Sequence, residues 1–281
     1  MKIGLNLWVW ESPFRTDRHL RLLEKAKSMG AEAVELALEE GCVLDGQVLR
    51  RALESHGLGC SMIGMFGTER DLSSPDASTR KKGLEYARRS FDLCAEAGVA
   101  VFSGACVGAG GSERLSNDER LNRYKHAAEC LHEIGDLAAE LHVPFCVEVL
   151  NRYEDSLLNT SAQGCELMRM TAHPAVGFHL DTFHMSMEEN SLGDAIRLAG
   201  KHLFHLHASE SQRGTPGTGN VQWREIAEAL RQINYQGFAT IESFNPAGRL
   251  APMARAWHPY ADSQDTLAEQ GLRFLREALL S

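Results

Sequence analysis

Eight short β-like runs alternate with amphipathic helical stretches along the whole chain, and this alternation constrains the fold most strongly. Alternation of this kind is typical of a parallel sheet, and eight βα units close a barrel. We therefore expect an α/β protein, a single (β/α)8 TIM barrel over residues 1–281, with an open doubly wound sheet as the alternative. The expected strands are 2–8, 33–38, 59–63, 100–105, 144–149, 176–180, 203–207 and 237–242. Helical spacing marks 17–29, 79–96, 118–141, 161–170, 223–233 and 266–280.

Composition excludes several classes of protein. A hydrophobic fraction of 43% and a charged fraction of 24% are those of a globular protein. The net charge of −9 disfavours binding to nucleic acid or to anionic membranes. No apolar run is long enough to span a membrane, and the seven cysteines are scattered without a CxxC pair. We expect a soluble cytoplasmic protein with reduced thiols.

Ionisable side chains stand at the carboxyl ends of four consecutive expected strands, the end where barrels carry their active sites. They are Glu148, Asp181, His207 and Glu242. A single buried acid is more often a salt-bridged structural residue. Three converging carboxylates repel one another unless a cation lies between them. No Lys or Arg occupies the strand ends themselves, so a bound divalent metal is the simplest compensation.

The donor set indicates which metal to expect. Three carboxylates and one imidazole favour Mn2+, with Mg2+ or Co2+ as alternatives, over a cysteine-rich zinc site. The absence of lysine at the strand ends disfavours aldolases that form a Schiff base.

Other polar residues lie close to these strand ends, and for them a structural role competes with a functional one. His184 suits a structural histidine as well as a site residue, and Arg213 and Glu154 could be solvated loop charges. His205 lies one layer below His207, which favours a hydrogen-bonded core residue over a ligand. Glu35 lies within the second strand as a further buried-looking acid. The glycine-rich segment 108–111 lacks the residues of a phosphate loop, so we interpret it as a flexible βα loop.

Four segments together resemble the ketose 3-epimerases of the xylose isomerase-like superfamily, which act on D-tagatose, D-allulose and L-ribulose. These segments are EVLNRYE (148–154), DTFHMSMEE (181–189), HASESQR (207–213) and ESF (242–244). The segment DLSSPD (71–76) also resembles that family's loop after strand three. The resemblance implies Glu148, Asp181, His207 and Glu242 as metal ligands. It implies Glu154, His184 and Arg213 as substrate contacts.

The same resemblance implies epimerisation at C3 of a free ketose, with Glu148 and Glu242 as the acid/base pair and an enediolate between the two proton transfers. It also implies a homodimer or homotetramer. The first-strand loop, with Asn6 and Trp8, and the loop 106–111 depart from the family pattern and leave the preferred sugar open. Alternatives on the same scaffold are an aldose–ketose or hydroxypyruvate-type isomerase, a sugar-phosphate epimerase, a DNA-repair nuclease and a non-catalytic sugar-binding barrel. Segment 246–260 has no assigned role in the barrel.

Overall fold

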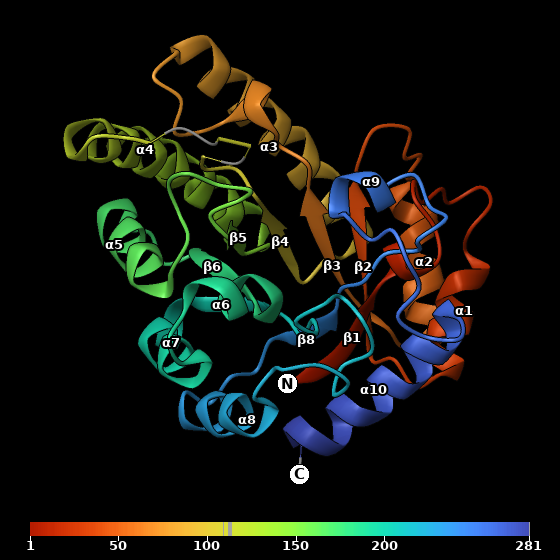
Figure 1. Cartoon of the computed structure of the whole chain (residues 1–281). Coiled ribbons are helices and arrows are strands. Elements are labelled where there is room, and N and C mark those ends of the chain that lie inside the picture. Colours follow the sequence, from red (N-terminus) through yellow and green to blue (C-terminus); the bar gives the residue numbers. More distant parts are fainter. Residues whose placement is uncertain (109, 112–113, 281) are drawn as a thin grey trace.

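The computed structural model describes residues 1–108, 110–111 and 114–280. Eight parallel strands form a closed barrel in sequence order, and β1 pairs with β8 to complete it (Figure 1). The expected TIM barrel is therefore confirmed. The strands are β1 (Lys2–Asn6), β2 (Ala33–Leu38), β3 (Gly59–Gly64), β4 (Val101–Gly104), β5 (Phe145–Val149), β6 (Val176–Asp181), β7 (Leu203–His207) and β8 (Phe238–Ile241).

Helices surround the barrel, and α10 packs along β1 to cover the point of closure (Figure 1). The α-helices are α1 (Arg21–Ser28), α2 (Gly46–His56), α3 (Ala77–Ala97), α4 (Asn117–Leu141), α5 (Ser161–Thr171), α6 (Thr182–Glu188), α7 (Leu192–Ala199), α8 (Trp223–Gln232), α9 (Ala251–Ala254) and α10 (Gln264–Leu280). The short 3-10 helices of the described residues are η1 (Leu7–Val9), η2 (Thr68–Arg70) and η3 (Gly200–His202). The helical pattern did not indicate α6, α7 or α9.

The first strand is shorter than its apolar pattern predicts. It ends at Asn6 because the Asn6 side chain accepts a hydrogen bond from the backbone N–H of Trp8 and caps η1. Such side-chain caps end an extended run by giving the backbone another partner. Similarly, α1 begins at Arg21 rather than at residue 17, because residues 15–19 form a turn in which the backbone N–H of His19 bonds to the carbonyl of Arg15.

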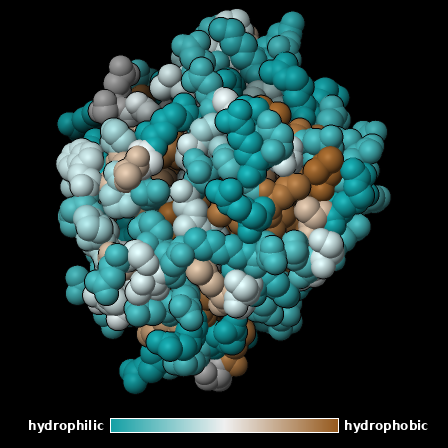
Figure 2. Space-filling model, turned by 90° about the vertical axis from the view of Figure 1, so that its right-hand side faces the viewer, coloured by the Kyte–Doolittle hydropathy of each residue, from teal (hydrophilic) through white to brown (hydrophobic). Residues whose placement is uncertain are grey.

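The segment 246–260 covers one side of the barrel mouth. It contains α9, and its residues Leu250 and Ala256 pack in one cluster with Trp8, Ala37 of β2 and Ile63 of β3. Figure 1 accordingly places α9 over the ends of β2 and β3. The right-hand face of the molecule is mainly hydrophilic, with separate hydrophobic patches (Figure 2).

The glycine-rich segment 108–111, interpreted from the sequence as a flexible βα loop, includes Ala109, which lies outside the described residues. None of the helices that the structure describes is both long and apolar enough to cross a membrane.

Candidate active site

Four ionisable side chains meet at the carboxyl end of the barrel, each placed by its strand. Glu148 is the penultimate residue of β5, Asp181 ends β6, His207 ends β7, and Glu242 directly follows β8. Asp181 and His207 are register partners, so their side chains are neighbours on adjacent strands. All four residues are at most 5% exposed.

His207 lies at the centre of this group. Its Nδ1 atom is 4.0 Å from Oε1 of Glu148, 3.7 Å from Oδ2 of Asp181 and 3.5 Å from Oε2 of Glu242. These separations exceed hydrogen-bond length, and Nδ1 has no hydrogen-bond partner among the described residues. A buried nitrogen that faces three carboxylates at this distance fits a ligand of a shared cation.

The charges of the group shift the pKa values in opposite directions. Burial raises the pKa of Glu148 well above its usual value, with Glu242 and Asp181 adding to the shift and His207 opposing it. Burial also raises the pKa of Asp181, but Arg213 and the neighbouring histidines outweigh it and hold that pKa well below normal. A buried carboxyl group at this end of the barrel is therefore ionised only when a cationic group lies beside it.

The residues present fit a divalent metal ion. Glu148, Asp181 and His207 offer ligand atoms that all lie within 4.8 Å of one another, and Glu242 lies beside them. Three carboxylates with one imidazole match the donors preferred by ions such as Mn2+. The other nitrogen of His207, Nε2, is 2.5 Å from Oε1 of Glu35. A carboxylate on the second nitrogen is the usual partner of a metal-binding histidine.

No arginine occupies the ends of β5 to β8 themselves, but Arg213 reaches them from a loop. Nη1 of Arg213 lies 2.6 Å from Oδ2 of Asp181 and also contacts Oε2 of Glu242. Arg213 belongs to the loop after β7, so its reach depends on how that loop folds. Its backbone has φ of +65°, which is uncommon for a residue other than glycine. The hydroxyl of Ser243 donates to the Arg213 carbonyl at 2.5 Å and supports this conformation.

His184 also points into the site, from the first turn of α6. The backbone N–H of Asn151 donates to Nδ1 of His184 at 3.2 Å, and the Asn151 side chain lies 2.7 Å from the same atom. Nε2 therefore carries the ring hydrogen and lies 3.9 Å from both Glu148 and Asp181. Burial lowers the pKa of His184 to about 3, so the ring is a neutral hydrogen-bond donor.

Glu154 stands at the edge of the same site. Its Oε1 accepts a hydrogen bond from Nδ2 of Asn151 at 2.9 Å, and its side chain is about half exposed. Asn151 thus joins Glu154 to His184. This linking role could not be predicted from the sequence, because an asparagine in a loop more often hydrogen-bonds within its own turn.

A cavity of about 270 Å3 opens above these residues. Its charged and histidine lining residues, Glu148, Glu154, His184, Arg213 and Glu242, lie close to one another. The rest of the wall is mainly apolar and includes Trp8, Ile63, Met65, Phe66, Phe183, Phe244 and Met253. All seven residues predicted for the site lie at this end of the barrel. Two aromatic residues, Phe183 and Phe244, were missed as individual site residues although they lie inside the quoted motifs.

Comparison with known proteins defines the class to which this barrel belongs. The family model described as the xylose isomerase-like TIM barrel matches residues 23–278. A probable ketose 3-epimerase from Synechocystis is 31% identical, covering 99% of this chain and 96% of the relative. A D-psicose 3-epimerase from Ruminiclostridium cellulolyticum is also 31% identical, covering 94% and 92%. A D-psicose 3-epimerase solved in the presence of D-fructose superposes with a TM-score of 0.89 at 31% identity, covering 100% of both chains.

The chain therefore belongs to the xylose isomerase-like TIM-barrel family and, within it, to the ketose 3-epimerases, which are isomerases. This result confirms the resemblance inferred from the four strand-end motifs.

Proposed function

We propose that this site inverts C3 of unphosphorylated ketoses with the help of one divalent cation. The observation that carries the proposal is the buried set of Glu148, Asp181, His207 and Glu242 around the free Nδ1 of His207. We propose these four residues as the metal ligands. The relatives' names, ketose 3-epimerase and D-psicose 3-epimerase, support the choice of substrate class.

Inversion at C3 removes a proton from one face of the carbon and returns a proton to the other. Glu148 and Glu242 project from strands three positions apart around the barrel wall, so a sugar between them meets one carboxylate on each side. One carboxylate takes the C3 proton, and the other, as a carboxylic acid, delivers a proton to the opposite face. General acid–base catalysis of this kind contributes roughly 10²–10⁴-fold.

Glu148, Asp181, His207 and Glu242 would hold the cation, which we propose to be Mn2+ with Mg2+ or Co2+ as alternatives. When bound, it would act as a Lewis acid and stabilise negative charge on the substrate.

The remaining polar residues orient the sugar. The Nε2–H of His184 and the guanidinium of Arg213 offer hydrogen bonds to oxygens at the reacting end of the substrate. Glu154 accepts from sugar hydroxyls at the cavity edge, where its exposed oxygen is available. Together, the two donors and the Glu154 acceptor fix the orientation of C3 between Glu148 and Glu242.

Charge in the cavity favours a free sugar over a sugar phosphate. The described residues that line the cavity include no lysine, and their one arginine, Arg213, contacts Asp181 and Glu242. A phosphate at the far end of the sugar would face Trp8, Phe66 and Met253 and would lose its hydration without an ionic partner.

We further propose that residues 1–281 act as one domain, in the cytoplasm, as a homodimer or homotetramer. The match of the family model to most of the chain supports a single catalytic domain.

Exchange with solvent tests the reaction. Protein stripped with EDTA and reloaded with Mn2+ is incubated in D2O with D-fructose, D-allulose, D-tagatose or L-ribulose, and NMR locates the deuterium. We expect metal-dependent label at C3 together with the C3 epimer. Label at C1 or C2, or formation of an aldose, would instead assign an aldose–ketose isomerase.

Variants test the two carboxylates separately. In Glu148→Gln or Glu242→Gln, one face of C3 lacks its base. Each variant should lose epimerisation by at least about 10²-fold. Each should still exchange the C3 proton of one epimer, and the two variants should act on opposite epimers. A Glu148→Gln protein that binds metal and retains full activity contradicts the assignment.

A further inference from the structure

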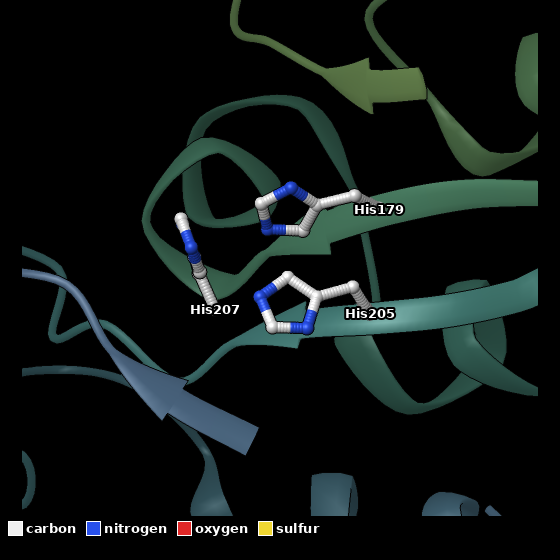
Figure 3. Close-up of side chains that lie close together, drawn as sticks. All are labelled: His179, His205 and His207. Carbon is white, nitrogen blue, oxygen red and sulfur yellow. The ribbon is translucent and has the colours of Figure 1, made fainter. Parts of the chain in front are cut away.

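Beneath the strand-end ligands, the barrel interior holds a second layer of polar side chains that the proposed reaction does not use. His179 of β6 and His205 of β7 are register partners two residues before Asp181 and His207, and their rings lie beside the ring of His207 (Figure 3). Both are fully buried, as are Glu35 of β2 and Ser61 of β3. Burying this many polar groups is costly unless they are paired. Their arrangement therefore calls for a specific role.

Glu35 is the centre of this layer. Its Oε1 lies 2.5 Å from Nε2 of His207, and its Oε2 lies 2.7 Å from Nε2 of His205. Asn6 donates from Nδ2 to Oε1 at 2.9 Å, and Ser61 donates from Oγ to Oε2 at 2.9 Å. One carboxylate thus joins residues from β1, β2, β3 and β7.

The surroundings fix which atom carries the hydrogen between Glu35 and His207. The Oδ1 atom of Asn6 accepts from the backbone N–H of Trp8, and this orients the amide so that its N–H faces Glu35. Both oxygens of Glu35 therefore act as acceptors. It follows that Nε2 of His207 is the donor. With Nε2 held by Glu35, the other ring nitrogen, Nδ1, is turned toward Glu148, Asp181 and Glu242.

We propose that Glu35 is a positioning residue that holds the Nε2–H of His207 and so keeps Nδ1 aimed at the cation site. The proposal rests on the proposed function only in assuming that His207 binds a metal. Three strands fix the carboxylate through Asn6, Ser61 and its own backbone position in β2, so the His207 ring is oriented before any cation arrives. A histidine that is already oriented loses less conformational freedom when it binds a metal ion, which favours binding.

The cluster of His179, His205 and His207 has a competing explanation, a second buried metal site. Their ring nitrogens approach closely enough to share an ion. However, the Nε2 atoms of His205 and His207 already lie within 2.7 Å of Glu35. We therefore expect one bound metal per chain.

The histidine tautomer of the unmodified protein is the first test. The protein loaded with Mg2+ and labelled with 15N at histidine is examined by long-range 1H–15N NMR, with His207→Gln used to assign the signals. We expect the ring of His207 to carry its hydrogen on Nε2. A hydrogen on Nδ1 overturns the proposal, and this measurement requires no Glu35 variant to fold.

The second test measures Mn2+ affinity by titration calorimetry. Glu35→Gln should weaken Mn2+ binding by roughly 10–100-fold, the usual cost of losing the outer partner of a ligand histidine. The matched control is Glu39→Gln, a buried carboxylate just after β2 that contacts Trp8, Ser12 and Arg249 but not His207. The control should bind Mn2+ as the unmodified protein does.

The possible outcomes separate this proposal from the proposed function. Unchanged Mn2+ affinity in Glu35→Gln, or two metals per chain in the unmodified protein, refutes the role of Glu35. If the unmodified protein binds one Mn2+ and Glu35→Gln weakens it, the role of Glu35 stands even where no ketose is epimerised. That last result would overturn only the proposed reaction.

Discussion

The guanidinium of Arg213 lies over the ring of Phe183, with Cζ 3.9 Å from the ring centroid. Phe183 follows Asp181 by two residues, so the same segment supplies both the ring and the carboxylate that Arg213 contacts. The ring and the carboxylate together restrict where the guanidinium can lie. A lysine could satisfy the charge but not this planar stacking.

Arg213→Lys is therefore expected to lower kcat/KM for the preferred ketose by at least about tenfold. The variant loses the stacking on Phe183, worth roughly 0.5–2 kcal/mol, and one charged hydrogen bond. Steady-state kinetics measure the effect. Arg224→Lys on α8 is the control, because the Arg224 side chain is 94% exposed and does not line the cavity. Native kinetics in Arg213→Lys contradict a role in substrate orientation.

Metal removal should lower stability as well as activity. A ligand at 100 times its Kd stabilises the folded state by about 2.7 kcal/mol, so EDTA treatment should lower the thermal midpoint and Mn2+ should restore it. Scanning calorimetry measures the shift. Asp181→Asn removes one proposed ligand and should show a much smaller response to Mn2+. An equal response in both proteins would place the metal elsewhere.

Phosphorylated sugars should be poor substrates. The kcat/KM for D-fructose 6-phosphate is expected to be at least about tenfold lower than that for D-fructose. The physical reason is the lack of a free cationic side chain in the described cavity lining. Both sugars are compared at the same Mn2+ concentration by chromatography of the products. A preference for the phosphate would make the enzyme a sugar-phosphate epimerase.

Asp155 gives the protein a pH-dependent stability, separate from the carboxylates proposed to be catalytic. Burial raises the pKa of Asp155 to about 7, although the backbone N–H groups of Leu157 and Leu158 oppose the shift. The folded state therefore holds a proton that the unfolded chain releases above pH of about 4. The contribution of Asp155 to the free energy of unfolding should fall as the pH rises from about 4 to about 7, and then level off.

Asp155→Asn tests this sign. The neutral amide can still accept the hydrogen bond from the backbone N–H of Leu157. At pH 8 the variant should therefore be more stable than the unmodified protein by about 1 kcal/mol or more. At pH 5 this gain in stability should be much smaller. Urea unfolding at the two pH values measures the difference. The control is Asp92→Asn on an exposed face of α3, which should give the same difference at both pH values. A pH-independent effect of Asp155→Asn would exclude the proposed linkage.

Some features of the site depended on local sequence and were predictable from it. Hydrophobic periodicity marked all eight strands, because each buried strand needs its own apolar run. Since parallel strands in a barrel share one carboxyl end, the residues ending β5 to β8 had to meet there. Glu148, Asp181, His207 and Glu242 could therefore be grouped without coordinates.

Other features were decided only by the tertiary structure. Arg213 reaches Asp181 and Glu242 because its loop adopts a positive φ, which no periodic pattern encodes. Asn151 holds His184, and Glu35 holds His207, across 33 and 172 residues of sequence. The sequence specified the strands and what their ends carry, since those follow from local burial. The contacts between these side chains depended on loop conformation and on the register of the barrel strands. Both are established only when distant strands pack together.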